Sequence, residues 1–279
     1  MNEKKCKIIN LIENTEGKNQ CLYEHGLSFY IETEKHKILV DTGASDAFLW
    51  NAKKLGVDIK EIDTVILSHG HYDHAGGILA FARENPSATI YMQDTAGREY
   101  YHKNDTMEKY IGIDPRIMEL PQVVKLCKNY RIDEELSLFS GVTGRKLWPL
   151  GNKELMIKKE GSFEQDEFAH EQYLVVETKN RKILISGCAH NGILNILEEY
   201  KKLYGTEPDI VISGFHMQKK NGYTEEDIEN IKQIAKELKQ RNTIFYTGHC
   251  TGELPFALMK NYMKDQLVYI HSGDEIPFA

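Results

Sequence analysis

One short stretch decides how this chain is interpreted: Ser68-His69-Gly70-His71-Tyr72-Asp73-His74-Ala75-Gly76-Gly77. It follows the apolar run Thr64-Val65-Ile66-Leu67, which is typical of a buried strand. Imidazole and carboxylate groups are common metal ligands in proteins. In an extended chain, side chains two residues apart point the same way, so His69 and His71 can bind one ion. Asp73 and His74 follow at a bend, which suits a second ion. A chance histidine-rich turn and buried core histidines are the alternatives, and the clustering at a strand end disfavours both.

The pattern His-x-His-x-Asp-His resembles the signature of the metallo-β-lactamase superfamily. Upstream, Ile38-Leu39-Val40-Asp41-Thr42-Gly43 resembles the first motif of that family, a strand that ends in Asp. The resemblance implies that Asp41 supports the metal-binding loop by hydrogen bonding. Alone, this segment would be read as a turn after a strand. The resemblance also implies a four-layer αββα sandwich, whereas the periodicity by itself supports only a mixed α/β fold.

The composition fits one ordinary globular domain. The 279 residues are 41% hydrophobic and 28% charged, and no apolar run approaches the length of a membrane span. The five cysteines are scattered and odd in number, which disfavours a disulfide framework and predicts a cytoplasmic protein. A net charge of −7 and short basic runs argue against nucleic acid as a partner, so a small molecule, phosphorylated or not, is expected. The sequence does not indicate the oligomeric state.

Strands and helices alternate along the chain. We expect a single domain over residues 1–279, with an insertion at about 97–165 that could cover the site. One expected helix has Ser45 as its N-cap and Gly56 just past its end. The strands are expected at 7–12, 27–32, 37–40, 64–67, 88–92, 173–178, 182–185, 209–212 and 243–246, and the helices at 45–55, 77–83, 192–203 and 224–239.

Four histidines in the second half lie close to strand ends: His170, His190, His216 and His249. A catalytic metal usually takes three protein ligands, so His69 and His71 need a partner from this set. The segments Gly-Cys-Ala-His, Gly-Phe-His and His-Cys-Thr-Gly resemble a branch of the superfamily related to dihydropterin ribofuranosylaminobenzene phosphate synthase. The resemblance implies that His190 and His249 are metal ligands, one for each ion.

Cys188 departs from the family pattern. Many members carry at this position an Asp that bridges the two ions. Cys188 could bridge them as a thiolate, which would favour Zn²⁺ or Fe²⁺, or it could be a packed thiol. His170 is a weaker ligand candidate, because His190 can fill its role. His25, His36, His102 and His271 are interpreted as structural, with His271 expected to approach the site most closely.

These residues predict a metal-dependent hydrolase. Two divalent ions, preferably Zn²⁺ with Fe²⁺ or Mn²⁺ as alternatives, would activate water and polarise a phosphoryl or carbonyl oxygen. Asp73, itself a ligand, would orient the water or take its proton, and His216 would protonate the leaving group. His216 could instead orient a ligand or contact the substrate. A synthase that joins a pterin to an aminobenzoate and releases diphosphate is one alternative. A non-enzymatic metal- or ligand-binding module is the other.

Overall fold

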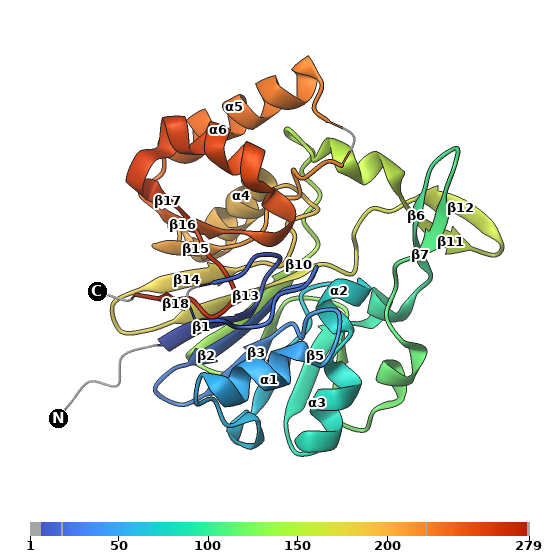
Figure 1. Ribbon diagram of the computed structural model, residues 1–279, viewed down its shortest axis with the longest axis vertical. Coiled ribbons are helices and arrows are strands. Elements are labelled where there is room, and N and C mark those ends of the chain that lie inside the picture. The colour runs from blue at the N-terminus through green and yellow to red at the C-terminus, as the bar shows by residue number, and fades with distance from the viewer. Residues whose placement is uncertain (1–6, 18, 221, 278–279) are drawn as a thin grey trace.

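The computed structural model describes residues 7–17, 19–220 and 222–277 (Figure 1). Two seven-stranded sheets form its centre. The first sheet has the order β18 (Glu275–Ile276), β1 (Lys7–Ile12), β2 (Ser28–Glu32), β3 (Lys37–Val40), β4 (Thr64–Ile66), β5 (Thr89–Gln93) and β8 (Val123–Leu126). The second has the order β17 (Leu267–Tyr269), β16 (Ile244–Thr247), β15 (Ile210–Ile212), β14 (Lys182–Ile185), β13 (Gln172–Glu177), β10 (Leu136–Ser140) and β9 (Tyr130–Arg131).

The two sheets pack against each other, and each carries helices on its other face. Side chains alternate along a strand, so neighbouring residues enter different cores. In β3, Ile38 and Val40 join a core shared with the second sheet, while Leu39 packs with helical residues of the first half. In β13, Leu174 enters the shared core, and Val175 packs against helices of the second half. The α/β class predicted from the sequence is confirmed.

The four helices expected from the sequence are present, and one of them differs from expectation at its cap. Helix α5 (Glu225–Lys239) begins with a capping box between Thr224 and Asp227. Helix α1 (Ala47–Lys54) begins two residues after Ser45, so the assignment of Ser45 as its N-cap was wrong. Ser45 Oγ instead accepts a hydrogen bond from the N–H of Ala47. The remaining helices are α2 (Tyr72–Ala75), α3 (Ile78–Glu84), α4 (Ile193–Tyr204) and α6 (Glu253–Met263).

Residues 97–165 are divided between three sheets. The middle of this segment supplies β8, β9 and β10 to the two large sheets. Its ends form a separate four-stranded sheet, which projects to one side of the molecule (Figure 1). The strand order of this sheet is β12 (Ser162–Gln165), β11 (Leu155–Lys159), β6 (Tyr100–Lys103) and β7 (Glu108–Tyr110). Tyr100 anchors it toward the predicted site, since its ring centroid lies 4.1 Å from that of His170.

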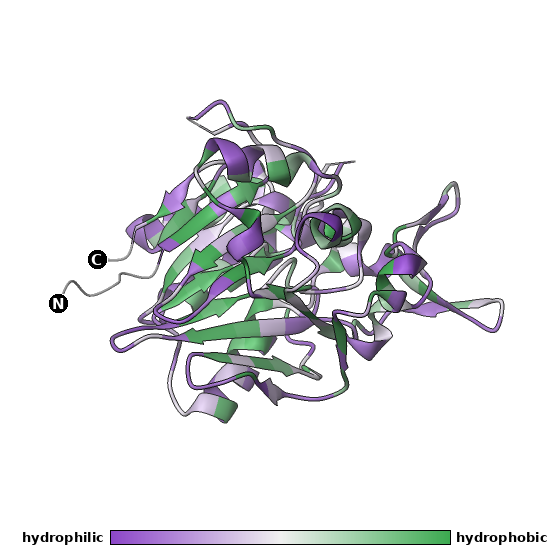
Figure 2. Ribbon diagram, turned by 90° about the horizontal axis from the view of Figure 1, so that it is seen from below, coloured by the Kyte–Doolittle hydropathy of each residue, from purple (hydrophilic) through white to green (hydrophobic). Residues whose placement is uncertain are grey.

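Apolar residues are concentrated on the strands of the two large sheets, and polar residues dominate the loops around them (Figure 2). Within the described part of the chain, no helix has both the length and the apolar character needed to cross a membrane. The strands β3, β4 and β5 are mutually parallel, as are β14, β15, β16 and β17. The carboxyl ends of parallel neighbours lie at one edge of a sheet, and the predicted ligands follow these ends.

Candidate metal centre

Four residues at strand ends have left-handed backbone conformations that are uncommon outside glycine. They are Asp41 after β3, Ala189 after β14, His216 after β15 and His249 after β16, with φ angles between 49° and 58°. Such conformations store strain and persist where the surrounding structure enforces them. Each lies at or next to a residue that the sequence singled out. The strand ends are therefore shaped to direct particular side chains into one region.

The loop after β4 is fixed by close packing. Gly70 separates His69 from His71, and a Cβ on it would lie 2.4 Å from the carbonyl oxygen of Ala96. The N–H of Gly70 donates to His170 Nδ1 at 2.8 Å, and His170 Nε2 lies 3.0 Å from Asp166 Oδ2. Both nitrogens of His170 are therefore engaged. His170 holds the loop, and neither of its nitrogens is free to bind an ion.

His69, His71 and His190 form the first group of potential ligands. One nitrogen from each lies within 4.8 Å of the others. All three side chains are buried, and their Nε2 atoms have no hydrogen-bond partner among the described residues. Buried polar nitrogens are rarely left unpaired, so this arrangement points to a ligand that is not a protein group. A metal ion satisfies three converging imidazole nitrogens.

Hydrogen bonds fix which nitrogen carries the lone pair in two of these rings. His190 Nδ1 lies 3.1 Å from Asn152 Oδ1, and His69 Nδ1 lies 2.9 Å from Ser68 Oγ, which itself donates to Asp41. Each Nδ1 therefore donates a proton and leaves Nε2 as a lone pair. Burial lowers the pKa of His71 to about 3 and lowers the pKa values of His69 and His190 well below the usual range. The group consists of neutral imidazoles, as metal binding requires.

Asp73, His74 and His249 form the second group. The Nε2 atoms of His74 and His249 are 3.2 Å apart, and Asp73 Oδ2 lies 3.7 Å and 3.3 Å from them. His74 Nδ1 donates to Asp41 Oδ2 at 2.7 Å, and His249 Nδ1 donates to Asn14 Oδ1 at 2.7 Å. Burial lowers the pKa of His74, but the Asp41 and Asp73 carboxylates outweigh it and raise the value to about 9. This group therefore attracts a positive charge to the space between the Nε2 atoms of His74 and His249.

Asp41 lies beneath both groups. Its carboxylate accepts hydrogen bonds from the Ser68 N–H and Oγ–H and from His74 Nδ1, each at 2.7 Å. It is 1% exposed. Asp41 therefore ties the loop after β4 to the end of β3 and orients one imidazole from each group, His74 directly and His69 through Ser68.

Cys188 lies between the two groups. Its Sγ is 3.2 Å from His74 Nε2, and it clusters with His69 and His74 on one side and with His190 and His216 on the other. The residue is buried, and burial raises the pKa of its thiol. This position is compatible with a sulfur that contacts both groups.

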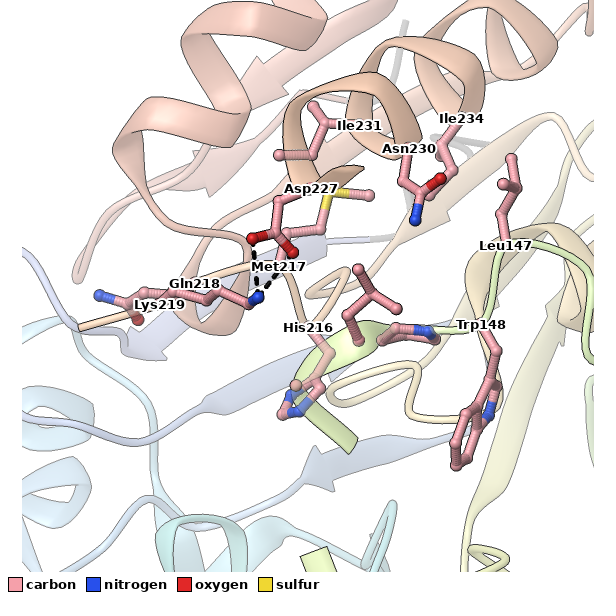
Figure 3. Close-up of a pocket in the computed structure, with 13 residues that line it drawn as sticks. Leu147, Trp148, His216, Met217, Gln218, Lys219, Asp227, Asn230, Ile231 and Ile234 are labelled. Carbon is pink, nitrogen blue, oxygen red and sulfur yellow. Dashed lines mark hydrogen bonds and ion pairs between the residues drawn. The ribbon is translucent and has the colours of Figure 1, made fainter. Parts of the chain in front are cut away.

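His216 lies beside the first group and borders a pocket. Its ring centroid is 4.1 Å from that of His190, and its Nδ1 is buried without a partner among the described residues. Figure 3 shows His216 and Trp148 at the base of the pocket and the Lys219–Asp227 ion pair at its side. The rest of the lining is largely apolar and includes Met217, Ile231 and Ile234.

His25, which was interpreted from the sequence as structural, also lies in this region. His25 Nε2 lies 3.4 Å from Asp73 Oδ2, and its ring centroid lies 5.1 Å from that of His249. His271, the structural histidine expected to approach most closely, instead contacts Thr15 Oγ1. His25 precedes β2, the neighbour of β3, so the strand order was the signal that would have found it.

Buried carboxylates surround the two groups. Five carboxylates are buried there: Glu13, Asp41, Asp73, Asp166 and Glu171. Among the described residues, the ion pairs of Asp41, Asp73 and Asp166 are with histidines alone, and Glu13 and Glu171 have none. Buried charges require compensation. Divalent cations at the two groups would provide it, so the electrostatics agree with the donor geometry.

Residues 24–154 match the sequence model of the metallo-β-lactamase superfamily. Two proteins of Methanocaldococcus jannaschii are similar over almost the whole chain. One is 7,8-dihydropterin-6-methyl-4-(β-D-ribofuranosyl)-aminobenzene-5′-phosphate synthase, 30% identical over 300 residues that cover 98% of this chain and 96% of the synthase. The other is the uncharacterized protein MJ0448, 30% identical over 272 residues that cover 94% of this chain and 96% of MJ0448.

A solved structure is also similar throughout. It is Tm1679, a metal-dependent hydrolase of the β-lactamase superfamily, with a TM-score of 0.84 and 28% identity over 99% of this chain and 100% of Tm1679. A shorter match, over 88 residues, is to an exodeoxyribonuclease of Streptococcus pneumoniae. The names of these relatives thus describe different activities.

Proposed function

Because this chain belongs to the metallo-β-lactamase superfamily, we propose that it is a hydrolase that uses two divalent ions to activate water against a small phosphorylated or ester-type molecule. The observation that carries the proposal is the pair of donor groups, each built from imidazoles whose free nitrogens face one another.

The described residues fit two ions. His69, His71 and His190 would hold one, and Asp73, His74 and His249 the other, with Cys188 between them. Nitrogen and sulfur donors favour Zn²⁺, with Fe²⁺ and Mn²⁺ as alternatives. When bound, such ions lower the pKa of water and polarise a phosphoryl or carbonyl oxygen.

The side chains around the ions would handle protons. Asp73 is 7% exposed. Its interactions with His74, His249 and His25 outweigh its burial and lower its pKa well below the usual value. It stays ionised and can accept a hydrogen bond from the attacking water. His216 lines the pocket on the other side, where a Cβ on Gly151 would lie 3.3 Å from its Nε2, and its imidazole can hold the proton for the leaving group.

The pocket beside His216 would receive the leaving group. Lys219 Nζ lies 2.6 Å and 2.7 Å from the two oxygens of Asp227, so its charge is neutralised within the pocket. The lining is otherwise largely apolar, with Trp148 as its widest flat surface (Figure 3). A phosphoryl or carboxyl group would therefore bind at the donor groups, and an uncharged, flat leaving group would lie against Trp148.

A synthase reaction is the second candidate, favoured by the similarity over 98% of the chain to the M. jannaschii synthase. A diphosphate leaving group could occupy the same donor groups, so the donor geometry does not separate the two reactions. The experiment is a panel of phosphoesters, lactones, thioesters, single-stranded DNA and pterin precursors, each assayed with Zn²⁺, Mn²⁺ and Fe²⁺. His69→Ala serves as the control for metal-dependent turnover.

Hydrolysis of a small ester that His69→Ala abolishes supports the hydrolase. Turnover confined to the pterin precursors would replace it with the synthase. Cleavage of DNA alone would contradict the prediction that nucleic acid is not a partner. Metal binding without turnover of any compound would favour the non-enzymatic module.

A further inference from the structure

We propose that two buried glutamates, Glu171 and Glu13, are positioning residues that each set the metal affinity of one donor group. Glu171 acts on the group that contains His190, and Glu13 acts on the group that contains His249. This inference rests on the proposed metal centre, but it assigns roles to residues that neither sequence motif includes. Each glutamate accepts the backbone N–H of the ligand that it positions.

Glu171 lies just before β13 and is fully buried. Its Oε1 accepts the N–H of His190 at 2.6 Å. Its Oε2 accepts the N–H and the side-chain amide of Asn191, both at 2.9 Å, and the hydroxyl of Tyr173 at 2.6 Å. Four donors therefore converge on one carboxylate, and two of them are the backbone of the ligand and of the residue after it.

Glu13 makes the equivalent contacts in the other half of the site. It follows β1 and is fully buried. Its Oε1 accepts the N–H of His249 at 2.5 Å and the hydroxyl of Tyr269 at 3.1 Å. Its Oε2 accepts the N–H and the hydroxyl of Thr15 at 2.7 Å and 2.5 Å. Glu13 and Glu171 thus share one arrangement: a buried carboxylate, a tyrosine hydroxyl and a ligand N–H.

These contacts act where the backbone is strained. His249 has a φ of 50°, and Ala189, directly before His190, has a φ of 52°. A non-glycine residue keeps such a conformation only when its surroundings hold it there. The bond from each glutamate fixes the peptide N–H at this point, and so fixes the direction of the imidazole that follows from it. Neither glutamate has a Lys or Arg partner among the described residues, so hydrogen-bond donors alone satisfy each carboxylate.

The test uses single-ion versions of the full chain. His249→Ala leaves the first group intact, and His190→Ala leaves the second. Glu171→Gln and Glu13→Gln are each introduced into both backgrounds, and the affinity for Co²⁺ is measured by competition with a chelator. Tyr173→Phe and Tyr269→Phe are the matched controls, because each removes one donor to a glutamate without changing the bond to the ligand. Circular dichroism and thermal unfolding without metal report folding.

Residues that orient metal ligands typically change metal affinity by about 10- to 100-fold when replaced. We expect a loss of this size for Glu171→Gln in the His249→Ala background and less than a twofold effect in the His190→Ala background. Glu13→Gln should give the reverse. Should a Gln variant not fold, Glu171→Asp and Glu13→Asp take its place, because they keep the carboxylate but shorten the side chain. The Co²⁺ affinity of the same donor group should fall in each.

Three results would overturn the inference. One is a folded Gln variant with unchanged Co²⁺ affinity in both backgrounds. Another is an equal loss at both groups, which would mean general loosening of the structure. The third is a wild-type chain that binds no Co²⁺, in which case the proposed metal centre fails as well. Two-ion binding by the wild type with unaffected glutamate variants would refute this inference alone.

Discussion

The Nε2 atoms of His74 and His249 face each other at 3.2 Å, and each ring donates its Nδ1 proton to an oxygen acceptor. Two nitrogen lone pairs at this separation repel unless a proton or a cation lies between them. Asp73 Oδ2 lies 3.3 Å from the His249 nitrogen and adds negative charge at the same point. The relationship explains why a second ion is expected beyond the one that the three-histidine group would bind.

The position of Cys188 leads to a spectroscopic prediction. With Co²⁺ bound, the wild-type chain should show a thiolate-to-metal charge-transfer band, because Cys188 Sγ lies 3.2 Å from His74 Nε2. Cys188→Ser should remove the band. Cys21→Ala is the matched control, since Cys21 is also buried but its side chain lies against Gly273. A wild-type spectrum without the band would identify Cys188 as a packed thiol.

His25 should affect activity more than stability. Its side chain is 55% exposed, so His25→Ala should change the free energy of unfolding by no more than about 0.5 kcal/mol. The contact with Asp73 lies at the solvent-facing side of the second group, so we expect kcat/KM to fall by about 10-fold. His102→Ala, at an ion pair with Glu154 on the small sheet, is the control. Equal activity of the two variants would show that His25 has no part in the site.

Trp148 should determine selectivity for the leaving group. Trp148→Ala should lower kcat/KM for an aryl phosphoester by about 10-fold and leave that for a methyl phosphoester little changed, since pocket contacts are worth about 1–3 kcal/mol. The only other tryptophan, Trp50, is 48% exposed on α1, so Trp50→Phe should alter neither value. An equal loss of kcat/KM for both substrates would show that Trp148 does not contact the leaving group.

We predict that the stability of the fold depends on pH through His36, which lies away from the metal centre. Its Nδ1 lies 2.8 Å from Asp63 and its Nε2 lies 2.9 Å from Asp133. Burial lowers the pKa of His36, but the two carboxylates outweigh burial and raise it above 6.5, while His36 helps to lower the pKa of Asp133 below 3.8. A raised histidine pKa stabilises the fold below 6.5, and this contribution is lost as the pH rises through the folded value. A lowered aspartate pKa stabilises the fold above 3.8, and this contribution is lost in acid.

The difference in Tm between the wild type and His36→Gln should therefore be largest near pH 5 and should disappear at high pH. Thermal unfolding measured from pH 4 to 10 checks this expectation. A difference that grows with pH would contradict it.

The sequence was sufficient for the elements that depend on local signals. The strands before Asp41 and His69 and the helix that begins after Thr224 were found because apolar runs and caps are local. The small sheet was not found, because β6 and β11 pair across more than fifty residues. Helix α6 was missed as well, although it opens with Glu253, because Pro255 lies within its first turn and interrupts a helical pattern.

The site shows the same division. The roles given to His69, His71, His190 and His249 remain predictions, but the geometry brings their nitrogens into two groups. His25, Glu13 and Glu171 carry no local signal, because a single His or Glu in a loop has no characteristic spacing. Their proximity to the ligands results from strand order, which joins β1, β2 and β3 in one sheet and places β13 beside β14.

Metal stoichiometry tests the central claim most directly. The wild-type chain, His190→Ala and His249→Ala are each loaded with Zn²⁺, freed of excess ion and measured by elemental analysis. We predict two ions per wild-type chain and one in each variant, because each variant loses a ligand from one group only. A wild-type chain that holds a single ion, or none, would contradict the account, and so would a variant that retains both.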